Sequence, residues 1–182
     1  MNSDAFCSFI SKNLLKGQAT HSDPGLNGGG WHIHKSGGKL NPHLDYSLHP
    51  KLKLQRKLNI IIYMNPNWDE DWGGSLGFWG NESATSPGDL IKSVWTKFNR
   101  AVIFDTTQNS WHGLPDLVSC PDDEARKSLA VYFLCEPPAN VDQRGKALFA
   151  PTAEQEGNHE ILDMIKTRSD IKTASSVYKK SY

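Results

Sequence analysis

The amino-acid sequence predicts a mainly β domain of sandwich or barrel type. Runs rich in β-branched and aromatic residues recur from Trp31 onward, and turn-forming Gly, Pro and Asn residues separate them. The clearest runs cover residues 57–64, 75–79, 100–105 and 128–135. Several short strands interrupted in this way are typical of β-sandwiches and β-barrels.

Helices are expected near the two ends of the chain. Apolar residues at positions 6, 9, 10, 14 and 15 have helical spacing and predict a helix over residues 6–15. A second helix is expected from Glu154 to about Tyr178, with an apolar stripe that includes Ile161 and Ile165. We expect this second helix to pack on the outside of the β core.

The length and the charge of the chain fit one ordinary globular domain. Its 182 residues suit a single domain over 1–182, with a barrel core at about 29–137 and a C-terminal helical extension at about 153–182. The 20 Lys and Arg residues balance the 20 Asp and Glu residues, so no nucleic-acid partner is expected. No apolar run approaches the ~18–20 residues that span a bilayer, so no membrane association is expected either.

The cysteines and the first ten residues favour a cytoplasmic protein. Cys7, Cys120 and Cys135 are widely spaced and form no CxxC pair, which is unlike a disulfide framework or a zinc site. Residues 1–10 lack the basic cluster and apolar stretch of a signal peptide. We therefore expect three reduced thiols in the cytoplasm.

Two histidines and one carboxylate form a candidate metal-binding set. His43 and Asp45 stand two positions apart, so in a strand their side chains point to the same face. His112 follows the predicted strand at residues 100–105. Two imidazoles and one carboxylate form the facial triad of non-haem Fe(II) oxygenases, which leaves coordination positions open. Taken alone, His43 and Asp45 could equally be a surface histidine and a turn aspartate.

A basic triplet supplies a candidate anion-binding group. Arg126, Lys127 and Ser128 lead directly into the strand at residues 128–135. Arg126 and Ser128 share one strand face, while Lys127 points to the other. A fixed guanidinium binds a carboxylate through two hydrogen bonds, and a hydroxyl beside it can add a third. A β-bulge would reverse the parity and turn Lys127 inward.

These motifs occur in the order of a known family. Residues 29–137 resemble the Fe(II)/2-oxoglutarate-dependent dioxygenases, and within them the prolyl 4-hydroxylase-like branch. The resemblance rests on the HxD triplet, the distal histidine, the RxS triplet, and the strand at residues 56–65 followed by W-x(3)-W-G-G-S-L. It implies a double-stranded β-helix, which is a jelly-roll or cupin-like barrel, with flanking N- and C-terminal helices.

The resemblance also implies roles for single residues. His43, Asp45 and His112 correspond to the Fe(II) ligands. Arg126 corresponds to the residue that binds the C5 carboxylate of 2-oxoglutarate, and Ser128 to its assisting hydroxyl.

Three further residues are candidates for binding the co-substrate. Tyr63 falls where related hydroxylases place a tyrosine against the same carboxylate, and Asn59 shares its strand face. Many prolyl hydroxylases also carry a tyrosine shortly before the first ligand histidine, which is absent here. His34, or His32 on the same strand face, is the candidate replacement.

The resemblance implies an oxygenase that hydroxylates a C–H bond and releases succinate and CO2. The substrate would be a prolyl residue of a protein or peptide, or a free proline-like molecule, with dioxygen as the second co-substrate. Ascorbate would maintain the iron as Fe(II). A non-catalytic jelly-roll binding module and a cupin-type metalloenzyme that needs no 2-oxoglutarate stay open as alternatives. The intact His-Asp-His set together with the RxS triplet speaks against a binding module, which needs neither. Arg126 speaks against the cupin-type enzyme, because it has no clear role without a dicarboxylate.

Overall fold

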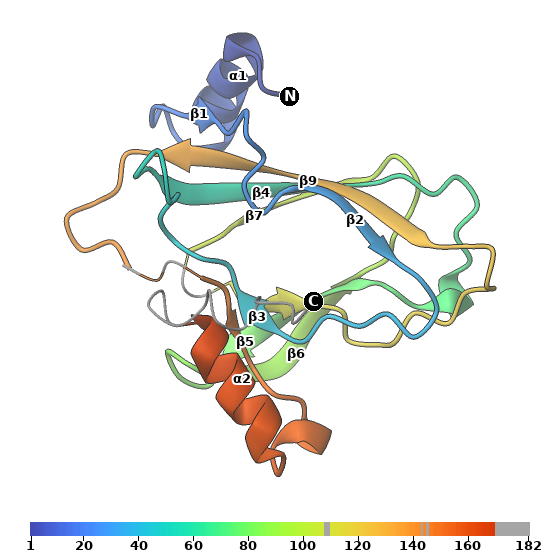
Figure 1. Cartoon of the computed structure of the whole chain (residues 1–182). Coiled ribbons are helices and arrows are strands. Elements are labelled where there is room, and N and C mark those ends of the chain that lie inside the picture. Colours follow the sequence, from blue (N-terminus) through green and yellow to red (C-terminus); the bar gives the residue numbers. More distant parts are fainter. Residues whose placement is uncertain (108–109, 143, 145, 170–182) are drawn as a thin grey trace, which may run out of the picture.

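A computed structural model shows two five-stranded sheets that face each other, with a helix on the outer side of each (Figure 1). It describes residues 1–107, 110–142, 144 and 146–169. The pairs within both sheets are antiparallel. This is the mainly β architecture with flanking helices that the sequence predicts.

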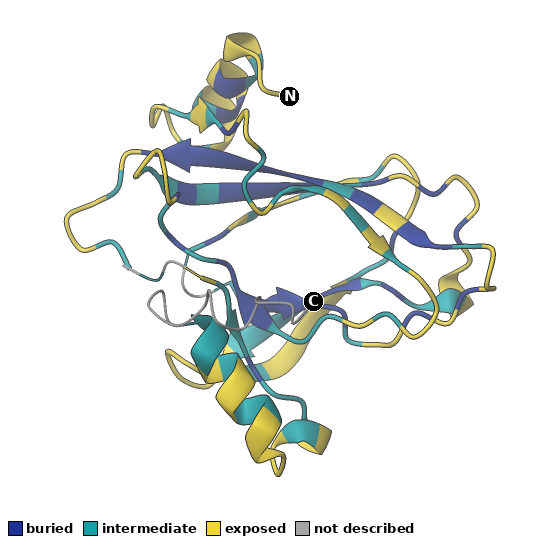
Figure 2. Ribbon diagram, in the orientation of Figure 1, coloured by how far each residue is buried: buried dark blue, intermediate teal, exposed yellow. Residues whose placement is uncertain are grey.

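The first sheet has the order β1-β9-β4-β7, with β2 also paired to β9. Its strands are β1 (His21–Ser22), β2 (Gly30–His34), β4 (Gln55–Tyr63), β7 (Ala101–Asp105) and β9 (Arg126–Cys135). Strands β4 and β9 are central and largely buried, because side chains pack against both of their faces (Figure 2).

The second sheet has the order β10-β3-β8-β5-β6. Its strands are β3 (His43–Leu44), β5 (Leu76–Asn81), β6 (Pro87–Val94), β8 (His112–Gly113) and β10 (Leu148–Phe149). A 3-10 helix, η1 (Glu70–Trp72), precedes β5. Strands β1 and β10 lie outside residues 29–137 in sequence, yet each pairs with a strand inside that range.

The N-terminal helix covers the outer face of the first sheet. Helix α1 (Asp4–Leu14) begins two residues before the predicted start, with Ser3 as its N-cap. Its buried residues Cys7 and Ile10 pack against one apolar cluster of the sheet. The sheet residues of this cluster are Leu58, Ile60, Val131 and Phe133.

The four predicted strands are all present, but the sequence reading missed β6. This strand lies at the edge of the second sheet, and residues 89–93 are all exposed. An edge strand that faces solvent needs few apolar residues, so its sequence lacks the alternation that marks buried strands.

The predicted C-terminal helix begins later than expected. Residues 153–155 form a separate 3-10 helix, η2 (Ala153–Gln155), and α2 (His159–Ser169) starts after Gly157. The Asn158 side chain accepts hydrogen bonds from the backbone N–H groups of Glu160 and Ile161, which caps α2 and fixes its start. The expected continuation to Tyr178 lies outside the described residues. In the part of the chain that the structure describes, no helix has the length and apolarity to cross a membrane.

The contact between α1 and the first sheet predicts a specific loss of stability. Ile10 is fully buried, so we expect Ile10→Ala to lower the free energy of unfolding by about 3 kcal/mol through lost burial and a residual cavity. Leu14→Ala, at a side chain that is 45% exposed on the same helix, is the control and should change it by less than about 1 kcal/mol. Urea denaturation of the two variants measures both values, and equal losses would contradict this packing.

Candidate metal centre and co-substrate pocket

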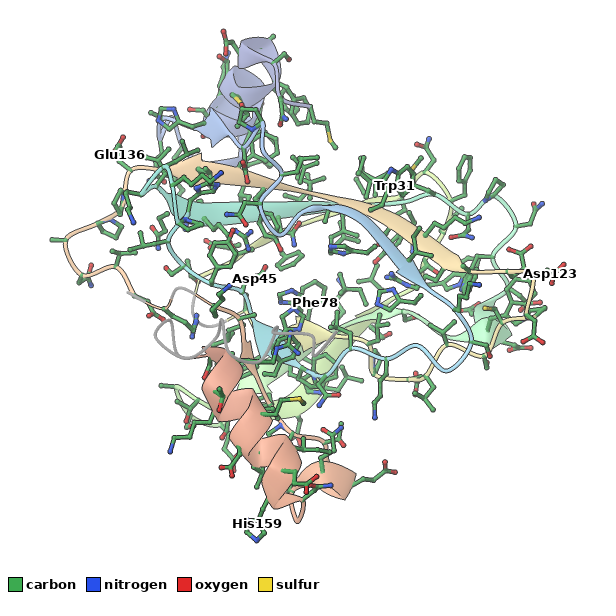
Figure 3. The ribbon with its side chains drawn as sticks, in the orientation of Figure 1. Trp31, Asp45, Phe78, Asp123, Glu136 and His159 are labelled. Atoms are coloured by element: carbon green, nitrogen blue, oxygen red, sulfur yellow. The ribbon has the colours of Figure 1, made fainter. Side chains whose placement is uncertain are left out.

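His43 and His112 lie directly opposite each other on neighbouring strands. They form the cross-strand pair of β3 and β8, and their ring centroids are 4.3 Å apart. Asp45 follows β3, with Oδ1 3.9 Å from His43 Nε2 and Oδ2 3.8 Å from His112 Nε2. All three residues are buried, and their ligand atoms lie within 4.8 Å of one another. Figure 3 shows Asp45 in the space between the two sheets. The three side chains can hold one metal ion.

Backbone carbonyls fix the orientation of both imidazoles. His43 Nδ1 lies 3.0 Å from the carbonyl oxygen of Asn41, and His112 Nδ1 lies 2.8 Å from that of Ser110. A carbonyl oxygen only accepts hydrogen bonds, so each Nδ1 carries a proton, and in the neutral form of the ring the lone pair lies on Nε2. This is the tautomer that a metal ligand needs, and the carbonyl contact is the usual outer support of a ligating histidine.

The charges of the site suit a cation. Burial lowers the pKa of His43 to about 4, and His112 contributes to the shift. Burial alone would raise the pKa of Asp45, but His112, His43 and Arg56 outweigh it, so this pKa is lowered. At neutral pH the site therefore presents a neutral His43 imidazole and an ionised carboxylate, which are the protonation states that bind metal.

Two features of the segment after residue 138 support the candidate metal-binding set. Strand β10 pairs with β3, and the Phe149 ring stacks on the His43 ring at a centroid distance of 4.9 Å. Arg144 donates a hydrogen bond to the backbone oxygen of Asp45 over 3.2 Å. On the other side of β3, a Cβ on Gly113 would lie 2.6 Å from the carbonyl oxygen of Leu40, so only glycine allows β8 to approach so closely.

Arg126 is a buried cation on the inner face of the first sheet. It is 3% exposed, and burial lowers its pKa. Its Nε donates to the carbonyl oxygen of Gly74 over 2.6 Å, and its Nη1 donates to Ser128 Oγ over 3.3 Å. Among the described residues, no carboxylate forms an ion pair with Arg126. A buried charge without a counter-ion is costly, so this guanidinium is suited to an anionic ligand.

Strand parity therefore favours Arg126 over Lys127 as the residue that faces the interior and can bind an anion. Arg126 and Ser128 are buried and Lys127 is exposed, as alternation along a strand requires. Gly74 fits the close approach of Arg126, because its φ is +75° and a Cβ there would lie 2.8 Å from Arg126 Cδ.

Unsatisfied polar atoms line the same inner face. Tyr63 pairs with Ser128, and its ring centroid is 5.3 Å from the Arg126 guanidinium. His34 pairs with Arg126, while Asn59 lies further along, opposite Tyr132. His34 Nδ1, Asn59 Oδ1 and Tyr63 Oη are among the buried side-chain atoms of the described residues that lack a hydrogen-bond partner. Burial raises the pKa of Tyr63, and burial together with Arg126 lowers that of His34 to about 4. A small polar ligand would satisfy such groups.

Two residues that contact the site were not identified from the sequence. Arg56 and Tyr132 both face Asp45: Tyr132 Oη donates to Asp45 Oδ2 over 3.0 Å, and Arg56 Nη1 lies 4.0 Å from Asp45 Oδ1. Alternation from Arg126 along β9 would have placed Tyr132 inward. Arg56 had no such signal, because a register shift between Arg56 and Leu58 breaks the alternation in β4.

The fold and the site define a class of protein. Two facing antiparallel sheets with a buried His-Asp-His set on one and a buried arginine on the other are typical of jelly-roll oxygenases that use a metal and an anionic co-substrate. The model of the 2OG-Fe(II) oxygenase superfamily matches residues 29–134. The chain belongs to this superfamily, whose members use Fe(II) and 2-oxoglutarate.

Individual proteins agree with this assignment. The chain is 31% identical over 91 residues to prolyl 3-hydroxylase OGFOD1 of Xenopus laevis, which is 48% of this chain and 17% of that protein. It is 28% identical over 78 residues to prolyl 3-hydroxylase OGFOD1 of Mus musculus, which is 43% of this chain and 14% of that protein. The matched segments thus span less than a fifth of these relatives.

A solved structure supports the fold. A prolyl 4-hydroxylase structure from Phytophthora capsici superposes with a TM-score of 0.50 at 17% identity, over 93% of this chain and 51% of that chain. The predicted family and the predicted double-stranded β-helix are both confirmed.

The buried histidine predicts how the stability of the metal-free protein depends on pH. Between about pH 4 and pH 6.5 the unfolded chain binds a proton at His43 that the folded chain does not, so stability rises with pH across this range. The contribution of this residue is about 3 kcal/mol, present above pH 6.5 and lost as the pH falls toward 4. Urea denaturation with a chelator present should show a shallower pH slope for His43→Gln. His159→Gln, at an exposed histidine, should keep the slope of the unaltered protein.

Proposed function

We propose that this protein is an Fe(II)- and 2-oxoglutarate-dependent hydroxylase of the prolyl-hydroxylase type. The observation that carries the proposal is the pairing of two buried features across the barrel. One sheet presents the His43–Asp45–His112 set, and the other presents a buried Arg126 without a carboxylate partner among the described residues. A metal ion and a dicarboxylate supply what each feature lacks.

His43, Asp45 and His112 would hold the metal. The donor set fits Fe(II), because two imidazole nitrogens and one carboxylate oxygen match the facial triad and leave further positions open. When bound, the iron supplies the activation of dioxygen that is coupled to the conversion of 2-oxoglutarate to succinate and CO2. The protein supplies orientation and a site shielded from water.

Arg126 would bind the far carboxylate of 2-oxoglutarate. Its contact with Gly74 holds the guanidinium in place, and Ser128 and Tyr63 present hydroxyls next to it. Charge-assisted hydrogen bonds of this kind are short and strong. His34, with a pKa of about 4, is neutral at pH 7 and would contribute a hydrogen bond rather than a charge. Asn59 would line the pocket next to Tyr132.

The substrate would be a prolyl residue of a protein or peptide, or a free proline-like molecule. Support comes from the names of the similar proteins, which are prolyl hydroxylases. The rival readings are weaker, because a binding module needs no buried metal-binding set, and a cupin-type enzyme without 2-oxoglutarate leaves Arg126 without a ligand.

The domain organisation, the cellular location and the partners of the protein form the next part of the proposal. We propose that residues 1–182 contribute one catalytic domain, since β1 and β10 join its core strands. Its three cysteines are free and buried, and its net charge is zero. The free thiols support a cytoplasmic location, and the zero net charge supports a protein that binds no nucleic acid. We also propose that the protein binds no membrane, since no apolar run approaches the ~18–20 residues that span a bilayer. Ascorbate would keep the iron as Fe(II).

Anaerobic titration with Fe(II) and 2-oxoglutarate tests the proposal. We expect a weak visible metal-to-ligand charge-transfer band, which His43→Ala abolishes because it removes a ligand. Arg126→Ala should raise the Kd of 2-oxoglutarate by about 10- to 100-fold, as the loss of a charge-assisted hydrogen bond predicts. Lys127→Ala, at the exposed neighbouring cation, is the matched control and should bind normally. A protein that shows no band would overturn the proposed function.

Substrate choice needs a separate measurement. Loaded with Fe(II), 2-oxoglutarate and ascorbate, the protein should form succinate faster when a prolyl substrate is added, and mass spectrometry should find a gain of one oxygen atom on that substrate. The panel contains proline-containing peptides, free proline and matched peptides with alanine in place of proline. Equal turnover with the alanine peptides would argue against a prolyl substrate.

A further inference from the structure

We propose that the Tyr132 hydroxyl, backed by Arg56, positions the Asp45 carboxylate so that the metal receives Oδ1 alone. The inference rests on the proposed function of the metal centre. Tyr132 is thus a positioning residue that acts through Asp45. Neither Tyr132 nor Arg56 belongs to the candidate set that the sequence motifs define.

The two carboxylate oxygens of Asp45 lie at nearly equal distances from the two histidines, one oxygen facing each. Oδ1 is 3.9 Å from His43 Nε2, and Oδ2 is 3.8 Å from His112 Nε2. A carboxylate placed in this way can bind a metal through one oxygen or through both. The two histidines alone do not decide between these modes.

Tyr132 removes this equivalence. Its hydroxyl donates a hydrogen bond to Oδ2 over 3.0 Å, which engages that oxygen and leaves Oδ1 for the metal. Burial raises the pKa of Tyr132 well above its ordinary value, and Asp45 adds to the shift, so the phenol keeps its proton. The residue is 3% exposed on the central strand β9, so water does not compete for the contact.

Arg56 holds the Tyr132 ring in place by packing its guanidinium against one face of that ring. Its guanidinium carbon lies 3.6 Å from the centroid of the Tyr132 ring and 3.4 Å from that of Tyr46, so the cation is held between two aromatic faces. Its Nη2 donates to Tyr46 Oη and to the carbonyl oxygen of Asn27. Arg56 Nη1 is 4.0 Å from Asp45 Oδ1, which favours the ionised carboxylate without a hydrogen bond to it.

The number of coordination positions gives this contact its importance. Two imidazoles and one carboxylate oxygen would occupy three of about six positions around a bound metal. A 2-oxo acid that chelates through two oxygens would take two more, and one would be left for dioxygen. A second oxygen from Asp45 would occupy that last position, so a one-oxygen carboxylate keeps the complete site open.

Nitric oxide, a stable stand-in for dioxygen, measures whether the last position is open. The protein is loaded anaerobically with Fe(II) and 2-oxoglutarate and exposed to nitric oxide, and the iron–nitrosyl complex is quantified by electron paramagnetic resonance. We expect Tyr132→Phe to reduce the nitrosyl signal at least about fivefold, the factor that the loss of one hydrogen bond gives. The charge-transfer band of the 2-oxoglutarate complex should persist.

Tyr46→Phe is the matched control. It keeps an aromatic ring on the opposite face of Arg56, and the hydroxyl it removes contacts Arg56 and Asn27 rather than the Asp45 carboxylate. Its nitrosyl signal should match that of the unaltered protein. An equal signal from Tyr132→Phe and the unaltered protein would overturn the inference. The absence of the charge-transfer band from the unaltered protein would instead overturn the proposed function.

Two analogues at position 132 keep the test decisive if Tyr132→Phe does not fold. 4-Fluorophenylalanine fills the volume of the hydroxyl without a proton to donate, and it should lose the nitrosyl signal. 4-Aminophenylalanine restores a donor at the same place, and it should recover the signal. A full signal with the fluoro analogue would refute the role of the hydrogen bond.

Discussion

The cross-strand pairing of His43 with His112 is the contact on which the rest of the site depends. Strands β3 and β8 have two residues each, so the ladder between them supplies few hydrogen bonds of its own. Their register is held by neighbours on both sides, because β10 pairs with β3 and β5 pairs with β8. The second sheet is therefore a frame that holds two imidazoles at the spacing one metal ion needs.

The first sheet places two buried cations, both arginines, across from this frame. Arg126 and Arg56 lie near the two ends of its inner face, and each is almost fully buried. Buried charges interact more strongly than exposed ones, because the interior screens them less. The chain as a whole is neutral, with 20 basic and 20 acidic residues. Affinity for a small dianion therefore depends on a few interior groups, and the surface can stay balanced.

Part of this architecture could be predicted from the sequence, for reasons that are physical. The RxS triplet begins β9, where buried and exposed residues alternate, so the inward orientation of Arg126 could be predicted. His43 ends up beside Asp45 although Asp45 lies just after β3, and residues 43–45 are all buried. Arg56 was not found, because the register shift next to it turns its side chain inward against the alternation of β4. The support that residues after 138 give to β3 was also missed, since β10 has two residues and no distinctive pattern.

The place of β3 in the second sheet has a consequence for how the chain folds. Both strands that flank β3, β8 and β10, come much later in the sequence, so their pairing must close long loops. Non-local strand pairing of this kind forms slowly compared with local contacts. The three side chains of the candidate metal-binding set are thus brought together only after the chain from His43 to His112 is available, and β10 adds its support later still. During synthesis, His43 and Asp45 emerge well before β8 and β10, the strands that flank β3. Iron therefore has no complete set of ligands to bind until β8 has been synthesised.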